Sequence, residues 1–243
     1  MSNLPLVSCL CTTYGRPVLL GEAIKCFADQ DYHNKELIVL NDQVGVELVM
    51  ENYPDNVFII NHPTRFNSLG EKRNFLKKLG KGEFFCIWDD DDLYAPYRIS
   101  KSLELMQGGR YDIVKAQSAL LSIDNKNYSD VRNLFHSQAC ITKEYMEKTN
   151  YPEISVGEDM AFEKGARIGS IYTRPFYVYR WGNCGISSGV HHLSGIADQK
   201  QSWNRSLSYE PYTKMNGRVV IKAEFQRDYW KEINALKVMK DFS

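Results

Sequence analysis

The sequence predicts an α/β fold with a Rossmann-like, mixed and mainly parallel sheet that is flanked by helices. Four short apolar runs, at residues 6–11, 36–40, 57–60 and 84–88, have the length of strands. The last run is continuously hydrophobic, as expected for a parallel strand that is buried on both faces. Amphipathic helical patterns lie between the runs, and polar residues follow several of them directly. Such alternation favours parallel strands with helices on both faces of the sheet.

Length and composition limit the classes of protein to consider. The 243 residues suffice for one large α/β domain or two small ones. We expect a domain at 1–221 and an amphipathic helix at 222–243, which either packs on the domain or contacts a second subunit. Hydrophobic residues make up 43% and charged residues 25%, which is typical of a globular protein. Lys plus Arg equals Asp plus Glu, at 30 each, so net charge does not indicate binding to nucleic acid or an anionic membrane.

The cysteines and the N-terminus bear on where the protein resides. None of the six cysteines forms a Cys-x-x-Cys pair or a zinc-binding spacing, which is typical of free thiols in a reducing compartment. The N-terminus lacks the pattern of a signal peptide, and no apolar stretch approaches the length of a membrane span. We therefore expect a cytoplasmic protein without a transmembrane segment.

The first unit of the chain is a strand, a loop and a helix. The loop 12–17 ends in Pro17, which can open a helix, and the apolar residues that follow recur at helical spacing. The second strand, 36–40, ends in Asn41-Asp42. A lone Asp at a strand end is often a turn former or a helix cap, and the functional alternative is an acceptor for a nucleobase or ribose.

Basic residues follow the third strand, in a helix that we expect at 69–79. Lys72 and Arg73 lie near its start, where the helix dipole favours anions. A solvated helix face is the ordinary explanation of such charges, so phosphate binding is one of two alternatives for these residues.

The acidic run Asp89-Asp90-Asp91-Asp92 follows the apolar strand 84–88 without an intervening turn residue. Adjacent carboxylates repel one another, and a divalent cation would relieve the repulsion because hard cations take carboxylate oxygens and bind phosphates. Ligands of open α/β sheets lie at the carboxyl ends of the strands. The acidic run therefore indicates a metal and phosphate site, which we favour over a solvated acidic loop.

The second half of the chain holds another pair of acids and a glycine-rich stretch. The elements expected there are helices at 97–106, at 143–148 and from 157 onwards, and strands at 113–116, 119–123, 133–141 and 171–180. Glu158 and Asp159 follow Gly157 at the start of a helix, so they either cap that helix or include a general base. The stretch 181–192 contains several glycines and ends in two histidines, which suggests a mobile lid near a ligand.

Together these motifs resemble those of family 2 glycosyltransferases with the GT-A fold, over residues 6–192. The matching stretches are Thr13-Tyr14-Gly15-Arg16-Pro17, Asn41-Asp42, Gly70-Glu71-Lys72-Arg73-Asn74, Trp88-Asp89-Asp90-Asp91-Asp92, Gly157-Glu158-Asp159 and Tyr179-Arg180-Trp181. Their shared order along the chain is what makes the resemblance specific. The second stretch departs from the family's Asp-Asp-Gly-Ser, because Gln43 and Val44 stand in place of Gly-Ser.

The resemblance implies a metal-dependent, inverting glycosyltransferase that moves a sugar from a nucleotide-sugar, with UDP as the nucleotide, to an acceptor hydroxyl. It assigns Asp159 as the catalytic base, Asp91 and His191 as ligands of Mn²⁺ or Mg²⁺, and Asp42 as the residue that reads the nucleobase. The other donor contacts that it implies are Thr12, Tyr14, Arg16, Lys72, Arg73, Asp89 and Asp90.

The acceptor is open between several classes. Polysaccharides and lipid-linked sugars are the family's most frequent acceptors, whereas a hydroxylated base in DNA, such as hydroxymethylcytosine in a phage, is the alternative. A basic surface for DNA or a solvated helix face would explain the cations near the C-terminus, which are Lys200, Arg205, Lys214, Arg218, Lys222 and Arg227. Other classes of protein are a nucleotidyltransferase, for which the N-terminal loop is a poor match, and a non-catalytic nucleotide-sugar binding module.

Overall fold

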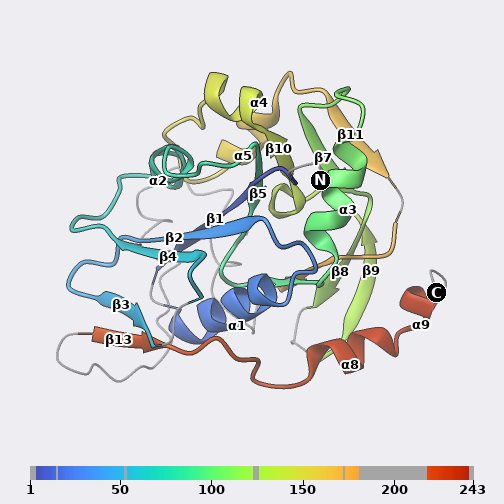
Figure 1. Cartoon of the computed structure of the whole chain (residues 1–243), viewed down its shortest axis with the longest axis horizontal. Helices are drawn as coiled ribbons and strands as arrows, with labels where there is room; N and C mark the ends of the chain where they lie inside the picture. Colours follow the sequence, from blue (N-terminus) through green and yellow to red (C-terminus); the bar gives the residue numbers. More distant parts are fainter. Residues whose placement is uncertain are drawn as a thin grey trace.

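A computed structural model describes residues 4–14, 16–51, 54–122, 126–171, 173–180 and 218–240. At its centre is a seven-stranded sheet with the strand order β11-β7-β10-β5-β1-β2-β4, in which only β10 runs against the others. These strands are β1 (Val7–Thr13), β2 (Lys35–Asn41), β4 (Val57–Asn61), β5 (Phe84–Ile87), β7 (Ile113–Ala116), β10 (Cys140–Thr142) and β11 (Ile168–Ile171). The prediction of a mixed, mainly parallel sheet flanked by helices is confirmed (Figure 1).

Helices cover both faces of this sheet. They are α1 (Pro17–Ala28), α2 (Leu69–Lys77), α3 (Arg98–Met106), α4 (Lys143–Lys148) and α5 (Glu158–Glu163). Successive residues of β1 face opposite sides, so Cys9 packs in one core with α1 and α3, and Leu10 packs in a second core with α2, α4 and α5. These two buried faces explain why the middle of each central strand is mainly apolar.

Two smaller sheets complete the described part of the chain. The first has the order β6-β12-β8-β9, with β6 (Leu93–Tyr94), β8 (Ser118–Ser122), β9 (Tyr128–Arg132) and β12 (Tyr177–Arg180). The second pairs β3 (Glu47–Met50) with β13 (Arg218–Ile221) in parallel. This pairing brings the C-terminal segment back beside α1 (Figure 1).

Two strand predictions for the second half are wrong. The strand predicted at 133–141 is a 3-10 turn, η1 (His136–Gln138), followed by the short β10. The single strand predicted at 171–180 is the end of β11 and all of β12, which belong to different sheets. Pro175 lies between them and has no N–H for a ladder, so it separates the two strands.

The C-terminal helix is also shorter than predicted. The continuous helix expected over 222–243 begins only with α8 (Tyr229–Asn234), and α9 (Lys237–Lys240) follows. The side chain of Asp228 accepts a hydrogen bond from the backbone N of Lys231 at 3.1 Å, and this cap sets the start of α8. Tyr229 and Ile233 are buried in the core that contains α1, so the segment packs on the domain. Its use as a contact between subunits stays a prediction.

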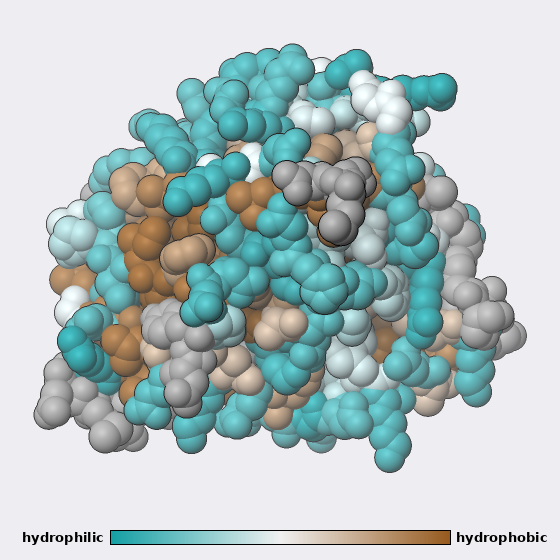
Figure 2. Space-filling view, viewed as in Figure 1, coloured by the Kyte–Doolittle hydropathy of each residue, from teal (hydrophilic) through white to brown (hydrophobic). Residues whose placement is uncertain are grey.

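Hydrophilic residues cover most of the face seen in Figure 2, and hydrophobic residues gather near β4, the last strand of the sheet. Phe58 of this strand is 45% exposed. Among the residues that the structure describes, no helix combines the length and the hydrophobicity needed to cross a bilayer.

Candidate active site

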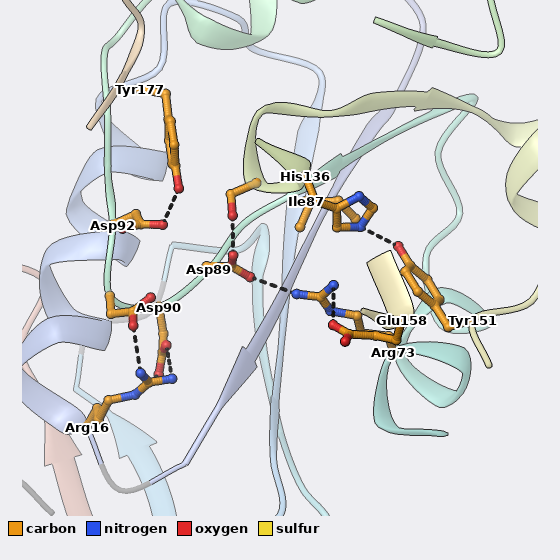
Figure 3. Close-up of polar contacts among 12 residues, drawn as sticks. Arg16, Arg73, Ile87, Asp89, Asp90, Asp92, His136, Tyr151, Glu158 and Tyr177 are labelled. Atoms are coloured by element: carbon orange, nitrogen blue, oxygen red, sulfur yellow. Dashed lines mark hydrogen bonds and ion pairs between the residues drawn. The ribbon is translucent and has the colours of Figure 1, made fainter. Parts of the chain in front are cut away.

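The carboxyl ends of three parallel strands meet at one edge of the sheet. β1 pairs with β2 on one side and with β5 on the other. The loop after β1, Asp42 after β2 and the acidic run 89–92 after β5 therefore lie together. The structure thus gathers predicted site residues from three strands, and Figure 3 shows part of their polar contacts.

Arg16 neutralises two carboxylates of the acidic run. Its Nη2 lies 2.6 Å from Asp90 Oδ1, and its Nε donates to Asp90 Oδ2 at 3.1 Å. Its Nη1 donates to Asp91 Oδ2 at 2.7 Å. Burial raises the pKa of Asp90 to about 7, while Arg16 lowers it and the charge of Asp91 raises it. A side chain from the loop after β1 therefore relieves part of the repulsion expected within the run.

The outer two carboxylates of the run have other partners. Asp89 accepts a hydrogen bond from Ser137 Oγ, and its Oδ1 lies 3.6 Å from Arg73 Nη2. Asp92 accepts a hydrogen bond from the hydroxyl of Tyr177 at 2.6 Å and another from a backbone N–H of β12 at 2.9 Å. Asp92 is 1% exposed, so it ties the run to β12, whereas Asp89 faces Arg73 (Figure 3).

Asp42 and Lys72 form a buried ion pair. Lys72 Nζ lies 2.5 Å from Asp42 Oδ1 and donates to the carbonyl oxygen of Thr13 at 2.7 Å. Asp42 Oδ2 accepts a hydrogen bond from the backbone N of Phe66 at 3.1 Å. Burial lowers the pKa of Lys72, and Asp42 opposes that change. Because Lys72 is 1% exposed, a solvated helix face is the wrong explanation of this residue.

Helix α2 docks against the segment that precedes the second acid pair. A Cβ on Gly70 would lie 1.8 Å from the carbonyl oxygen of Pro152, so this close approach requires glycine. Asn74 Nδ2 donates to the carbonyl oxygen of Tyr151 at 2.7 Å, and the backbone N of Tyr151 donates to Asn74 Oδ1 at 2.9 Å. The Gly-x-x-Arg-Asn spacing therefore has a physical reason, because its first and last residues hold Arg73 in place.

Arg73 joins the acidic run to the second acid pair. Its Nη1 lies 3.1 Å from Glu158 Oε1, while its Nη2 faces Asp89 (Figure 3). Its guanidinium lies over the ring of Tyr151, 5.6 Å from the centroid. Burial raises the pKa of Glu158, while Arg73 lowers it and Asp159 raises it. Glu158 is therefore committed to a structural ion pair.

Asp159 lies at the start of α5, next to Glu158. Gly157 caps this helix with a φ of 79°, a backbone conformation that favours glycine. Asp159 is half-buried, and its Oδ1 accepts a hydrogen bond from the backbone N of Met160 at 2.8 Å. Met160 is 74% exposed, so this end of α5 faces solvent. Asp159 therefore combines a local hydrogen bond in the first turn of α5 with a partly accessible carboxylate.

Thr12 and Tyr14 lie at the end of β1 and in the loop that follows. Thr12 lines a small hollow together with Arg73 and Asp89. The guanidinium of Arg65 lies over the ring of Tyr14, 4.7 Å from the centroid. Sequence reasoning missed Arg65, because a single Arg in a loop has no distinguishing pattern.

A series of buried polar contacts ends at the hydroxyl group of Tyr151. His136 Nε2 lies 2.9 Å from the hydroxyl oxygen of Tyr151, and His136 Nδ1 lies 2.6 Å from Glu163 Oε1. Lys115 Nζ lies 2.5 Å from the same oxygen of Glu163. These contacts link β7, η1 and α5 to Tyr151, whose ring lies against the guanidinium of Arg73.

Sequence reasoning missed His136 and Ser137. Both lie in η1, within the stretch 133–141 for which a strand was expected. Ser137 reaches Asp89 of the acidic run, and His136 reaches Tyr151, because β10, which follows η1, pairs with β5. A His-Ser pair before a short apolar run is the available signal, but its meaning depends on a strand pairing that hydrophobicity does not reveal.

The chemistry of the acidic run fits a hard divalent cation. The carboxylate oxygens of Asp89 and Asp91 are ligands that Mg²⁺ and Mn²⁺ prefer. Within the described part of the chain, no three His, Cys, Asp or Glu side chains are arranged as a metal site. The run would therefore supply part of a ligand set, which substrate phosphates can complete. His191, the other predicted ligand, and the predicted lid 181–192 lie outside the described residues.

Comparison with known proteins agrees with the fold and the motifs. Residues 8–164 match the family described as Glycosyl transferase family 2, and the chain belongs to this family. A putative colanic acid biosynthesis glycosyl transferase, WcaA, from Escherichia coli strain K12 is 33% identical over 106 residues, which cover 41% of this chain and 37% of that protein. A GalNAc(5)-diNAcBac-PP-undecaprenol beta-1,3-glucosyltransferase from Campylobacter jejuni is 29% identical over 60% of this chain and 43% of its own length. The chain thus spans less than half the length of these two relatives.

Solved structures share the fold at low sequence identity. The mannosyltransferase PcManGT from Pyrobaculum calidifontis, in complex with GDP-Man and Mn²⁺, has a TM-score of 0.58 and 15% identity, over 86% of this chain and 67% of that chain. S. aureus TarS in complex with UDP-GlcNAc has a TM-score of 0.56 and 15% identity, over 72% of this chain and 58% of that chain. The predicted GT-A fold is confirmed.

Proposed function

We propose that this chain transfers a sugar from a nucleoside-diphosphate sugar to an acceptor hydroxyl, with inversion at the anomeric carbon. The observation that carries the proposal is Arg73, which faces the acidic run at Asp89 and the second acid pair at Glu158. The two motifs that the family uses for donor and acceptor chemistry therefore flank one guanidinium. Family membership favours this reaction over nucleotidyl transfer and over a non-catalytic binding module.

The proposed nucleotide is UDP. Asp42 follows the end of β2 and pairs with Lys72 of α2, and the family resemblance implies that Asp42 contacts the nucleobase. The complex of TarS with UDP-GlcNAc supports uridine, whereas PcManGT is in complex with GDP-Man, so the fold accommodates more than one base. Arg16 and Arg73 supply guanidinium groups near the acidic run, and such groups match the oxygens of a diphosphate.

The proposed cofactor is Mn²⁺ or Mg²⁺, with Asp91 as a ligand, Asp89 nearby and His191 as a further ligand. A bound cation would supply Lewis-acid neutralisation of the charge on the leaving diphosphate. The oxygen ligands of the acidic run and the Mn²⁺ in the PcManGT complex support this assignment.

Asp159 is the proposed general base. It would take the proton of the acceptor hydroxyl as that oxygen forms its bond to the anomeric carbon. The bond between the anomeric carbon and the diphosphate breaks, and the nucleotide leaves with the electron pair. Glu158 suits this role less, because it is buried and paired with Arg73, whereas Asp159 is partly accessible.

The proposed acceptor is a sugar hydroxyl of a polysaccharide or of a lipid-linked glycan. The names of the Escherichia coli and Campylobacter jejuni relatives mention colanic acid and an undecaprenol-linked glycan. A hydroxylated DNA base is less well supported, because Arg218 pairs with Glu47 and Arg227 with Glu232. These contacts reduce the positive charge that the described C-terminal segment offers to phosphates.

The proposal is tested by supplying sugars linked to UDP, GDP, TDP and CDP with Mn²⁺ and measuring release of the nucleoside diphosphate. We expect release from a UDP-sugar and its loss when EDTA removes the metal. Release that persists in EDTA contradicts the metal assignment, and tighter calorimetric binding of GDP than of UDP contradicts the uridine preference. No release or transfer from any of the donors contradicts glycosyl transfer itself.

A further inference from the structure

Arg16 is held mainly by one of its two carboxylate partners. Nε of Arg16 lies 3.1 Å from Asp90 Oδ2, and Nη2 lies 2.6 Å from Asp90 Oδ1, which is the two-point contact of a guanidinium with a carboxylate. Asp91 receives Nη1 at 2.7 Å. Asp90 is 1% exposed and Asp91 is 6% exposed, so these charges interact in poorly solvated surroundings. The two contacts with Asp90 thus fix the position of the Arg16 guanidinium, and the single contact with Asp91 is the one that another ligand can replace.

The contact with Asp91 places Arg16 in competition with a metal ion. Asp91 Oδ2 accepts its hydrogen bond from a group that carries a full positive charge. A divalent cation on the same carboxylate would lie close to that guanidinium, and two cations repel strongly where solvent screening is weak. Metal binding without a nucleotide must therefore displace Nη1 from Asp91, and no new anion arrives to compensate it.

We propose that Arg16 is a built-in counter-ion, which occupies the place of the divalent cation until the diphosphate of the donor arrives. This inference rests on the proposed function and concerns how its metal site is controlled. The diphosphate brings enough negative charge for both cations. Arg16 keeps its two contacts with Asp90, the carboxylate of Asp91 turns away from Nη1 to ligate the metal, and Nη1 donates to a phosphate oxygen instead.

Two consequences distinguish this role from simple support of the loop. Metal and nucleotide strengthen each other's binding by the same factor, because coupling between two sites is reciprocal. A neutral side chain in place of Arg16 removes the competitor, so the metal alone binds more tightly and the coupling becomes weaker. A residue that only supported the loop would do the opposite, since its loss would weaken metal binding.

The test compares Arg16→Gln and Arg16→Lys with the matched control Arg167→Gln. Arg167 makes a similar two-point contact with Asp112, at 3.1 and 2.8 Å, but at the amino ends of β7 and β11. That is the opposite edge of the sheet from the site. The affinity for Mn²⁺ is measured from the electron paramagnetic resonance of the free ion, with and without UDP, and circular dichroism verifies the fold.

We expect the parent to bind Mn²⁺ about tenfold more tightly with UDP than without it, within the usual range of coupling between sites. Arg16→Gln should bind Mn²⁺ alone about tenfold more tightly than the parent and lose most of the coupling. Arg16→Lys keeps the charge and should stay closer to the parent, and Arg167→Gln should match it.

Mn²⁺ affinity in Arg16→Gln that equals or falls below that of the parent overturns the inference while the proposed function stands. The parent alone provides a second readout, since equal Mn²⁺ affinity with and without UDP also overturns it. A parent that binds no Mn²⁺ even with UDP overturns the proposed metal site and the inference together.

Discussion

The guanidinium of Arg73 lies 3.1 Å from the carboxylate of Glu158. The same side chain faces Asp89 at 3.6 Å, so it spans the acidic run and the turn that carries Asp159. Arg73 thereby bridges two acidic motifs that are far apart in the sequence, alongside the contacts of Gly70 and Asn74 that hold α2 against the segment before α5.

Replacing Arg73 by Gln should lower turnover about 100-fold, because the loss of a preorganised charge at a developing anion has effects of that size. Arg73→Lys should recover little, since an ammonium group cannot face two carboxylates as the guanidinium does. Steady-state rates at saturating donor measure the effect, and Lys78→Gln, an exposed change just after the same helix, is the control. Parental turnover in Arg73→Gln would show that the bridge has no part in the reaction.

The Asp42–Lys72 pair should contribute to stability as well as to the site. Lys72→Met leaves Asp42 as an unpaired buried charge, and breaking a buried pair in this way costs about 3–5 kcal/mol. The double variant Asp42→Asn/Lys72→Met should recover much of that loss, because the buried charge is gone. Urea unfolding of the parent and both variants measures this. A loss below ~1 kcal/mol in Lys72→Met, the size typical of an exposed pair, would refute the buried-pair account.

Local patterns were sufficient to predict the central strands and the first helices. β1, β2, β4 and β5 are short, mainly apolar runs, and α1 has regular helical spacing, so each can be recognised from neighbouring residues alone. β10 and η1 could not be recognised in this way. Their structure depends on pairing with β5 and β7, which lie far away in the sequence.

The same limit applies to the site. Asp42 and the acidic run directly follow strands, so their place at the sheet edge follows from the sequence once a parallel sheet is assumed. Tyr151 and His136 act through contacts with α2 and α5 that only tertiary packing creates. No local pattern marks either residue as part of the site.

His136 should affect the rate more than the affinity for the donor. His136→Ala removes the support of Tyr151, the ring beneath Arg73, and small displacements of positioning groups cost roughly 10- to 100-fold in rate. We expect kcat to fall while KM for the donor changes little. His136→Gln should restore part of the rate, because its amide can still reach the hydroxyl of Tyr151.

Tyr151→Phe tests the same chain of contacts from its other end, since it removes the hydroxyl and keeps the ring. It should reproduce part of the loss in kcat. If His136→Ala reduces only the free energy of unfolding and leaves kcat unchanged, the residue supports the fold and not the site.

The Asp112–Arg167 pair should add a small, acid-sensitive contribution to stability. Hydrogen bonds from Arg167 lower the pKa of Asp112 to about 2, although burial opposes this. Because the folded pKa lies below the unfolded value of about 3.9, the contribution is present above pH ~4 and is lost as the pH falls towards 2. The side chain of Arg167 is 62% exposed, so solvent screening keeps this contribution to stability small.

Denaturant unfolding of the parent and Asp112→Asn at pH 5 and at pH 2.5 measures this contribution. The parent should be the more stable protein at pH 5, and the difference should shrink at pH 2.5. A difference that is the same at both pH values would exclude Asp112 as its source.

Asp159 requires a control that leaves Arg73 undisturbed. Glu158→Gln is unsuitable, because the carboxylate of Glu158 holds Arg73. Glu153→Gln changes an exposed acid of the segment that leads to α5 and should leave rate and affinity at parental values.

The central claim is that Asp159 acts as a base in the transition state and is not only a helix cap. The most direct measurement compares the transfer rate and the UDP affinity of Asp159→Asn with those of the parent, in the presence of Mn²⁺. Asn caps a helix almost as well as Asp but cannot take a proton, so turnover should fall by roughly two to four orders of magnitude while UDP affinity stays nearly parental. Near-parental turnover in Asp159→Asn would contradict this account.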